Sequence, residues 1–422
     1  MIILLLSLFF LLMFLRVPIA ISLSLSTIMI LMLTDFNMDM IPQRFFTALD
    51  SFPMMAIPGF VLAGVLLARG GISKYLIEAL RTWVGHISGG LAVVTILACS
   101  IFAAISGSSP ATAAAIGSIM IPAMVNAGYD KKYTMGLIAA AGTLGILIPP
   151  SIPLIIYGIT AEESIGKLFM AGIIPGVLLT GVLVVSAIFH ARKNGYGRGE
   201  KATWHERRKS SLKAIWGGFL PILILGTIYS GIVTPTESAV IAVFYGIIVS
   251  VFIYRELHWR DIRPIIIESI NISAMIFLII GAASLFGLYL TNAQIPQQIG
   301  AWIAESDMNK WTFLIIINIM FFVMGMFLEA VSIILITLPI LLPILIFFDI
   351  NLIHFAIIMT INMELGMITP PVGLNLFVVS GIAKEKLGSV VRGVIPFIFI
   401  MIIVLIVVML FPQLSLWLSD RM

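Results

Sequence analysis

The sequence predicts an all-α polytopic membrane protein in which two inverted repeats follow one another. Three observations predict this fold class. Hydrophobic residues make up 60% of the 422 residues and charged residues only 10%, whereas soluble domains carry about 25% charged residues. Apolar runs long enough to cross about 30 Å of hydrocarbon recur along the chain, and one offset aligns helix-breaking residues of the two halves. A soluble enzyme and a disordered scaffold are therefore excluded, as is an outer-membrane barrel, because the apolar residues do not alternate with polar ones.

The charge distribution gives no reason to expect a nucleic-acid partner, and the cysteine content excludes disulfides within the chain and cysteine metal clusters. The formal net charge of +4 arises from Lys and Arg in short loops between apolar runs, which the positive-inside rule explains without a nucleic-acid partner. The single cysteine, Cys99, lies in an apolar run, so no intramolecular disulfide or cysteine metal cluster is expected. Residues Met1 to Leu15 lack a basic leading region and are expected to be a retained first span.

Apolar runs between polar breaks predict nine spans. They lie near residues 1–34, 52–68, 133–160, 167–191, 213–230, 236–254, 264–290, 353–382 and 390–415. Two further apolar stretches, 92–124 and 311–346, are interrupted at Ser106 to Pro110 and at Gly325 to Glu329. Each of these two is predicted to be a re-entrant hairpin.

The distribution of basic loops supports the two hairpins. Loops rich in Lys and Arg lie near residues 69–81, 131–132, 192–213, 255–263 and 384–386. They fall on one side of the membrane only if both hairpins return to the side they entered. The first hairpin then opens from the cytoplasm and the second from outside. Connections 35–50, 161–166, 291–310 and 347–353 are poor in Lys and Arg, as expected for the opposite side.

An offset of 221 residues relates the two halves. It pairs Pro122 with Pro343, Pro149-Pro150 with Pro370-Pro371, and Gly172-x-Ile174-Pro175 with Gly393-x-Ile395-Pro396. The first repeat is predicted over 1–191, with scaffold helices 1–68, arm 72–85, hairpin 92–124, broken helix 133–160 and helix 167–191. Residues 192–235 form a cytoplasmic connector and a linker helix. The second repeat follows over 236–422, with scaffold helices 236–290, arm 294–304, hairpin 311–346, broken helix 353–382 and helix 390–415.

The two arms, Ile72 to Val84 and Ile295 to Ala304, mix charged and apolar residues at helical spacing. They are expected to lie in the membrane interface. Ordinary polar loops with some helix are the alternative.

The two Pro-Pro pairs are expected to break their helices within the membrane. Two adjacent prolines remove two backbone donors and clash with the preceding turn, which leaves unpaired backbone groups at membrane depth. Freed carbonyls can ligate a cation, and the start of the second half-helix offers amides to an anion. A packing kink satisfied by neighbouring helices is the alternative.

The first hairpin tip, Ser106 to Thr112, concentrates hydroxyl groups and glycine, which suits sodium. Small residues for close helix packing are the alternative, and that alternative is favoured for Ala113, Ala114, Ala115 and Gly117. The second break, Gly366 to Asn375, supplies the equivalent set, with Thr369 and Asn375 as its polar side chains.

Glu329, at the second hairpin tip, is interpreted as functional because an acid at this depth is costly. An aqueous tip that faces solvent is the alternative. Glu237 and Glu268 are interpreted as structural residues near the interfaces, whereas the roles of Glu364 and Arg16 stay open.

A membrane enzyme is disfavoured. Ser106-Gly107-Ser108 superficially suggests a serine nucleophile, but the nearest histidine in sequence, His86, lies in an expected surface loop. The five histidines are scattered and form no metal or diacid motif. An ion channel is a further alternative.

The chain resembles the large membrane subunit of tripartite ATP-independent periplasmic (TRAP) transporters, within the wider ion transporter superfamily. The resemblance covers essentially the whole chain. It rests on Gly107-Ser108-Ser109-Pro110-Ala111-Thr112-Ala113-Ala114, Gly145-Ile146-Leu147-Ile148-Pro149-Pro150-Ser151 and Leu365-Gly366-Met367-Ile368-Thr369-Pro370-Pro371-Val372-Gly373. It implies a multi-pass protein of the bacterial inner membrane, an elevator mechanism and transport driven by sodium, not ATP. It also implies two partners besides the lipid bilayer: a small four-helix membrane subunit and a soluble periplasmic substrate-binding protein.

The resemblance also implies where ligands bind. The first sodium site is expected at Ser106, Gly107, Ser109, Gly142, Gly145 and Pro149, and the second at Gly325, Met326, Glu329, Gly366, Thr369 and Val372. Substrate is expected between them, at Ser106, Ser108, Ser151, Glu329 and Asn375. Family members often carry Asp near the second tip, so Glu329 departs from the pattern by one methylene.

The substrate is expected to be an organic acid. Glu329 would repel a simple dicarboxylate but accept hydrogen bonds from a hydroxyl-rich monocarboxylate, so sialic acid or a similar sugar acid is favoured over a C4-dicarboxylate. A stand-alone sodium- or proton-coupled dicarboxylate carrier, which needs no binding protein, is the alternative.

Overall fold

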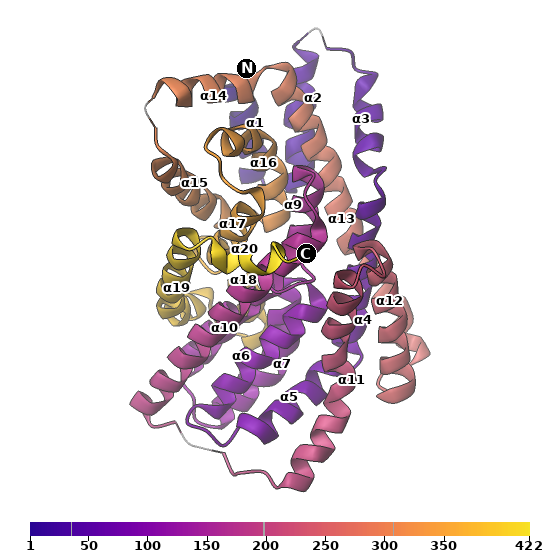
Figure 1. Ribbon diagram of the computed structural model, residues 1–422, viewed down its shortest axis with the longest axis vertical. Coiled ribbons are helices and arrows are strands. Elements are labelled where there is room, and N and C mark those ends of the chain that lie inside the picture. Colours follow the sequence, from indigo (N-terminus) through magenta and orange to yellow (C-terminus); the bar gives the residue numbers. More distant parts are fainter. Residues whose placement is uncertain (35, 197–198, 307) are drawn as a thin grey trace.

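The computed structural model describes residues 1–34, 36–196, 199–306 and 308–422. These residues form α-helices, two short 3-10 segments and one π-helical segment, with no strand among them. The predicted all-α fold class is therefore confirmed. Figure 1 shows an elongated bundle with the N-terminus at one end of its long axis and the C-terminus near the middle.

The helices of the first half and the linker are α1 (Ile2–Phe14), α2 (Ile19–Met32), α3 (Met40–Leu49), η1 (Phe52–Met55), α4 (Ala56–Arg69), α5 (Ile72–Val84), α6 (Gly90–Ser106), α7 (Ser109–Asn126), α8 (Lys131–Thr143), η2 (Leu144–Ile146), α9 (Ile152–Ala161), α10 (Ile165–Asn194) and α11 (Trp204–Tyr229). The second half contains α12 (Pro235–Ile247), η3 (Ile248–Ile253), α13 (Trp259–Asn292), α14 (Ile295–Glu305), α15 (Lys310–Gly325), α16 (Ala330–Phe347), α17 (Leu352–Met367), α18 (Leu374–Ala383), α19 (Leu387–Leu410) and α20 (Gln413–Ser419).

Seven helices among the described residues are long and apolar enough to cross a membrane. They are Phe52–Arg69, Ile165–Asn194, Trp204–Tyr229, Pro235–Ile253, Trp259–Asn292, Ala330–Phe347 and Leu387–Leu410. The rest of the apolar sequence forms shorter helices, because hairpin tips, proline pairs and turns interrupt it.

The helices of the two halves correspond at the predicted offset of 221 residues. Helix α7, over residues 109–126, maps onto residues 330–347, which are the bounds of α16. The pairs α5 and α14, α6 and α15, α8 and α17, and α9 and α18 agree within a few residues. Figure 1 shows that hairpin α6–α7 and hairpin α15–α16 approach the centre from opposite ends. The exact repeat boundaries at residues 191 and 236 stay a prediction.

Both helices with a proline pair are broken. Helix α8 ends at Thr143 and α9 begins at Ile152, while α17 ends at Met367 and α18 begins at Leu374. The Pro149-Pro150 and Pro370-Pro371 peptide bonds are both cis. Each pair thus lies in the non-helical segment between two half-helices.

The N-terminal segment differs from its prediction as one span over residues 1–34. It forms two packed helices, α1 and α2, that turn back at Arg16, Val17 and Pro18. Arg16 adopts a left-handed backbone with φ of 64°, and Pro18 begins the next helix because it cannot continue the previous one. Each helix is about 20 Å long, too short to cross the hydrocarbon. The N-terminus therefore lies at the same end of the molecule as the connection after α2 (Figure 1).

Two connections contain more helix than predicted. Helix α3 occupies most of the expected loop 35–50 and packs against α13. Helix α11 begins at Trp204 and not at 213, because Thr203 and Glu206 form a reciprocal capping box. Residues 35, 197–198 and 307 of the expected connections lie outside the described residues.

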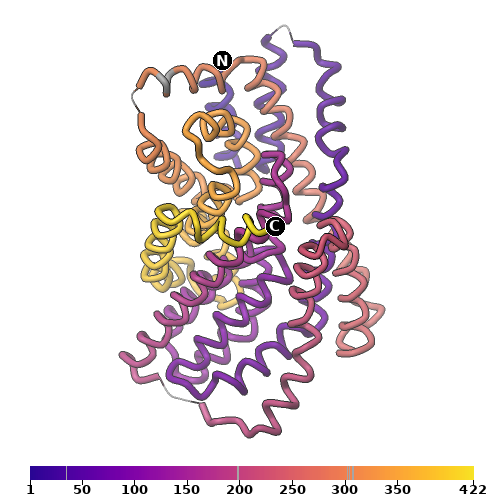
Figure 2. Tube along the Cα trace, in the orientation of Figure 1, coloured from indigo at the N-terminus to yellow at the C-terminus, as the bar shows by residue number. Residues whose placement is uncertain are grey.

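The two arm segments are the helices α5 and α14, and their place in the membrane interface stays a prediction. Helix α5 buries Ile72, Leu76 and Ile77 on one face and packs between α6 and α11. Glu237 caps α12 through the backbone and hydroxyl of Thr234, and Glu268 forms an ion pair with Arg69. Figure 2 traces the connection of these outer helices to the central hairpins.

Close packing at glycine joins the first broken helix to the second repeat. A Cβ on Gly136 of α8 would overlap the carbonyl group of Gly393 on α19, and one on Gly393 would overlap the carbonyl of Lys132. Backbone therefore meets backbone here, as small residues permit between membrane helices.

We expect Gly136→Ala to destabilise the protein by about 1–3 kcal/mol, because the methyl group meets rigid backbone. Thermal unfolding of detergent-solubilised protein measures the effect. Gly218→Ala on α11 is the matched control, since a Cβ there has nothing within 4 Å. Equal melting temperatures for the two variants would contradict the packing described.

Candidate substrate and cation site

The first hairpin tip is a tight turn between α6 and α7. Gly107 ends α6 in the left-handed region with φ of 60°, which glycine adopts without steric cost. Ser108 precedes α7 in an extended conformation, and Pro110 lies in the first turn of α7, where its missing N–H is harmless. The sequence thus places two helix ends and their free backbone groups at one point.

Hydroxyl groups gather inside this tip. The Ser106 and Thr112 hydroxyl oxygens lie 2.8 Å apart, and the Thr112 hydroxyl donates to the Ser108 carbonyl at 2.9 Å. Ser106 is 3% exposed and Thr112 is fully buried. Thr112 was part of the predicted tip but was not assigned to a site, and the signal that would have found it is its place one helical turn after Ser108.

The first break packs against this tip. A Cβ on Gly145 would lie 2.5 Å from the Ser108 carbonyl oxygen, and one on Gly107 would lie 2.8 Å from that of Pro150. Gly142 approaches Ala113 of α7 in the same way. These glycines allow backbone oxygens of tip and break to lie together, so most residues of the first predicted sodium site are neighbours.

Ser151 begins the second half-helix of this break. Its hydroxyl donates to the Ile146 carbonyl at 2.5 Å and accepts from the Leu154 amide at 3.4 Å. Because that hydroxyl caps α9, its described bonds are structural. The predicted contact between Ser151 and substrate stays a prediction.

The second tip and break repeat the arrangement. The Met326 carbonyl accepts from the Val372 and Gly373 amides at 3.1 and 3.2 Å. In the first repeat, the Ile152 amide donates to the Gly107 carbonyl at 3.5 Å, and Ile152 corresponds to Gly373 at the offset of 221. Each tip therefore accepts a hydrogen bond from the start of its own second half-helix.

Two further residues of the predicted second sodium site lie at this contact. Gly325 and Gly366 pack backbone to backbone, since a Cβ on Gly325 would lie 2.9 Å from the Gly366 Cα. The Thr369 hydroxyl donates to the Leu365 carbonyl at 2.6 Å, which leaves its oxygen lone pairs available to a cation.

Glu329 precedes α16 and lies in a cavity with residues of α2 and α13. Among the described residues, no side chain or amide is bonded to its carboxylate. It lines a cavity of about 280 Å³ together with Gly325, Met326 and Val372 of the same tip and break. The opposite wall comes from α2 and α13, through Pro18, Ile19, Ala20, Met275, Leu278 and Ile279.

This cavity does not include every predicted substrate residue. Four residues of the predicted second sodium site line it, whereas Ser106, Ser108, Ser151 and Asn375 do not. The structure thus groups Glu329 with the second tip, and the serines with the first.

Asn375 of α18 links the second repeat to the first tip. Its amide nitrogen donates to the Ser109 hydroxyl at 2.7 Å and to the Ala139 carbonyl at 3.1 Å. The side chain is fully buried, and its Oδ1 atom has no hydrogen-bond partner among the described residues. A buried acceptor without a donor is costly, and a cation is one group that would satisfy it.

The oxygens of both tips suit a hard monovalent cation. They belong to hydroxyl, carbonyl and amide groups and to the carboxylate of Glu329, and the described residues contain no cluster of three His, Cys, Asp or Glu side chains. Such a set fits sodium better than a transition metal.

Glu364 is a second acid within the central helices. It lies on α17, is fully buried, and neither carboxylate oxygen has a partner among the described residues. It corresponds to Thr143 of the first repeat, whose hydroxyl bonds to its own helix at Ala140. The acid is therefore specific to the second repeat.

Comparison with known proteins agrees with this architecture. Residues 6–414 match the family model of the tripartite ATP-independent periplasmic transporter, DctM component. The C4-dicarboxylate TRAP transporter large permease protein DctM of Pseudomonas aeruginosa is 44% identical over 377 residues, which cover 89% of this chain and 88% of that protein.

Two longer relatives match over only part of their own length. The isethionate TRAP transporter permease protein DctMQ of Oleidesulfovibrio alaskensis is 41% identical, over 90% of this chain and 60% of that protein. The sialic acid TRAP transporter permease protein SiaT of Haemophilus influenzae is 37% identical, over 95% of this chain and 65% of that protein.

A solved structure shows the same fold. The Alcanivorax borkumensis YdaH transporter superposes with a TM-score of 0.64, covering 90% of this chain and 88% of that one at 15% identity. The curated relatives are named as transporter permeases, so the membrane-enzyme alternative is excluded. The chain is thus a multi-pass membrane protein that belongs to the large permease component of the tripartite ATP-independent periplasmic transporters.

Proposed function

We propose that the chain takes up an organic acid across the bacterial inner membrane, driven by a sodium gradient. The observation that carries this proposal is the paired contact of each hairpin tip with the break that follows it. Two such contacts place hydroxyl, carbonyl and amide groups together within apolar surroundings. Cations and an anionic substrate are the ligands that such groups bind.

An elevator movement is the mechanism that fits this arrangement. The hydrogen bonds and glycine contacts join each hairpin to its broken helix. Asn375 of the second broken helix bonds to Ser109 of the first hairpin, so the four elements form one unit. The cavity beside Glu329 lies between that unit and the helices α2 and α13, and its walls are largely apolar. A surface without strong directional bonds favours sliding of the unit against a scaffold.

We further propose the two partners that the sequence predicted. A small membrane subunit would pack on the scaffold helices, and a periplasmic binding protein would deliver the substrate. The relative named DctMQ supports the first, because about 40% of that permease lies outside the matched region. The stand-alone carrier remains the competing proposal.

For the substrate, the unpaired Glu329 favours a sugar acid such as sialic acid. A hydroxyl-rich monocarboxylate can donate hydrogen bonds to this carboxylate, whereas a second carboxylate would be repelled by it. The relative SiaT supports this class. A C4-dicarboxylate is the second candidate, favoured by the 44% identity to the Pseudomonas protein.

Uptake into proteoliposomes tests the proposal as a whole. Vesicles that hold the chain and its small subunit receive labelled sialic acid or succinate, with and without a sodium gradient and the binding protein. We expect uptake only when both sodium and the binding protein are present. Uptake without the binding protein would favour the stand-alone carrier, and uptake unaffected by sodium would refute the coupling.

We expect Ser106→Ala to raise the sodium concentration for half-maximal uptake at least tenfold, because a hard oxygen is lost from the first tip. Initial uptake rates across a sodium series measure this. Ser118→Ala on the same hairpin is the control, since that exposed hydroxyl bonds only within its own helix, to Ala115. An unchanged sodium dependence would remove Ser106 from the site.

Glu329→Gln separates the two substrate classes. If a sugar acid donates hydrogen bonds to the carboxylate, its uptake falls at least tenfold, because a charged acceptor becomes a weaker neutral one. A C4-dicarboxylate would instead be carried as well or better. Competition between the two labelled acids gives the result, with the exposed Glu305→Gln as control for charge alone. Equal uptake of sialic acid by both variants would sink the sugar-acid assignment.

A further inference from the structure

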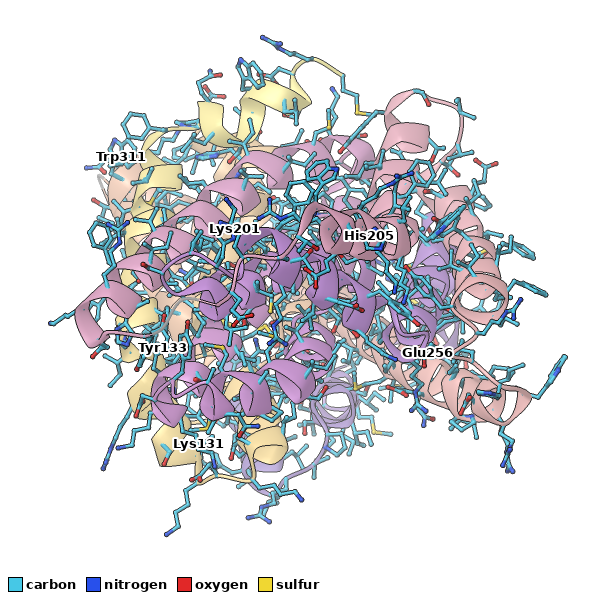
Figure 3. All side chains as sticks on the ribbon, turned by 90° about the horizontal axis from the view of Figure 1, so that it is seen from below. Lys131, Tyr133, Lys201, His205, Glu256 and Trp311 are labelled. Atoms are coloured by element: carbon cyan, nitrogen blue, oxygen red, sulfur yellow. The ribbon has the colours of Figure 1, made fainter. Side chains whose placement is uncertain are left out.

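A second cavity lies away from the hairpin tips, at the end of the molecule that the basic loops predict to be cytoplasmic. It measures about 790 Å³. Its walls come from α5, from the start of α11, from residues 199–202 of the connector, and from the base of the first hairpin at Leu91 and Tyr129. Figure 3 looks onto this end of the molecule, where Lys201 of the connector and His205 of α11 are labelled. The cavity is separate from the site beside Glu329, which has a different lining.

Charged side chains of both signs line the cavity without pairing. The cations are Arg81, Lys201, Lys209 and Lys213, and the acids are Glu78, Glu200 and Glu206. The ion pairs among the described residues are Arg69–Glu268, Lys74–Glu256, Lys131–Glu385 and His258–Asp261, so none joins two charges of this cavity. Glu206 is engaged in the cap of α11, and the Lys213 ammonium lies 5.4 Å from the centroid of the Tyr75 ring. The cavity charges therefore have no ion pair with one another among the described residues, and they can hold a ligand.

The two helices that line the cavity, α5 and α11, are joined next to these charges. The hydroxyls of Thr82 on α5 and Ser210 on α11 lie 2.9 Å apart and join the helices. Glu78 and Arg81 flank this bond on α5, while Lys209 and Lys213 lie one turn apart on α11. An acid and three cations therefore converge on one hollow between two packed helices.

Exposed tryptophans lie on the two helical walls of the cavity. Trp83 on α5 and Trp204 and Trp216 on α11 are 43%, 71% and 43% exposed, and tryptophan is enriched at membrane interfaces. On α11 the lysines adjoin Leu212 and Ile215, which are 59% and 58% exposed. Exposed apolar side chains of α11 therefore adjoin the charged hollow, and we expect them to face lipid.

We propose that this cavity binds the headgroup of a phospholipid that carries both a phosphate and a primary ammonium, as phosphatidylethanolamine does. The phosphate would lie between Lys209, Lys213 and Arg81, and the ammonium would lie against Glu78 and Glu200. The acids are the reason for this choice. A purely anionic headgroup would leave them uncompensated, whereas a methylated ammonium would offer them no N–H donors.

Tyr129 brings the base of the first hairpin to the cavity. Its side chain is 5% exposed. It lines the cavity together with Leu91 and Ala127 of the same hairpin base. The bound headgroup would then bridge the arm to the first hairpin.

This bridge gives the lipid a role in transport, which rests on the proposed elevator movement. A headgroup held between α5, α11 and the hairpin base stabilises one position of the hairpin relative to the arm. Removal of the lipid should therefore change the uptake rate without changing the substrate preference. Lipid binding itself is measured without transport, so its failure and the failure of the proposed function are distinguishable.

Lipid retention tests the inference. The purified full-length chain is stripped of lipid, mixed with equal amounts of phosphatidylethanolamine, phosphatidylcholine and phosphatidylglycerol of matched acyl chains, and repurified. Mass spectrometry then counts the bound lipids. We expect at least fivefold more phosphatidylethanolamine than either of the other two. Equal retention of all three would overturn the proposal.

Charge variants show whether the cavity is the place of binding. Lys209→Gln with Lys213→Gln should abolish the excess of phosphatidylethanolamine, whereas Lys384→Gln with Lys386→Gln, the same charge change outside the cavity lining, should keep it. Glu78→Gln with Glu200→Gln keeps the phosphate site, so it should bind phosphatidylethanolamine and phosphatidylcholine alike. Because these two cavity variants lose different contacts, failure of one to fold leaves the other as a test. An undiminished excess in a folded cavity variant would refute the site.

A water-soluble headgroup distinguishes a lipid from a soluble ligand. Glycerophosphoethanolamine carries the same phosphate and ammonium but has no acyl chains. At equal concentration it should displace less than a tenth of the bound lipid, because it lacks the apolar contact with α11. Displacement as effective as that by the intact lipid would show a site for a soluble phosphate and would overturn the lipid assignment.

Discussion

The structure depends on how it satisfies backbone groups where helices stop inside the membrane. Hydrocarbon offers no hydrogen bonds, so every interrupted helix needs a partner at the same depth. Each hairpin tip supplies that partner to the break of its own repeat, at Gly107 with Ile152 and at Met326 with Gly373. The polar groups that remain are the ones a ligand can use. Binding capacity is thus a consequence of the way in which the breaks are stabilised.

Glycine makes the contacts between tips and breaks possible, in one of two ways at each position. At Gly107 it permits a left-handed turn, while at Gly145 and Gly366 it permits backbone to lie against backbone. Larger residues would push tip and break apart and would expose the groups that now pair. Asn375 adds a direct bond between the repeats, from α18 to the first tip. The two halves of the site are therefore coupled by a side chain as well as by packing.

Charge is distributed by depth. Ion pairs such as Arg69–Glu268 and Lys131–Glu385 lie near helix ends, where their side chains are partly exposed and contribute little to stability. Within the central helices the described acids Glu329 and Glu364 lack partners. An unpaired acid at this depth lowers the stability of the folded protein, so each of the two positions is a destabilising one. The cavity between α5 and α11 shows the intermediate case, in which opposite charges line one hollow without forming ion pairs.

The sequence by itself determined the all-α class, the two hairpins, the two breaks and the 221-residue offset. Proline pairs and tip residues interrupt a helix at their own positions, and basic loops collect on one side of the membrane. It did not determine that residues 1–34 turn back at Arg16, because a long apolar run is compatible with one span and with two short helices. Nor did it determine which predicted site residues meet. Only tertiary packing turned Glu329 towards α2 and α13 and brought Asn375 to Ser109. Such contacts join residues far apart in the chain, and their geometry follows from how whole helices pack, which local patterns do not encode.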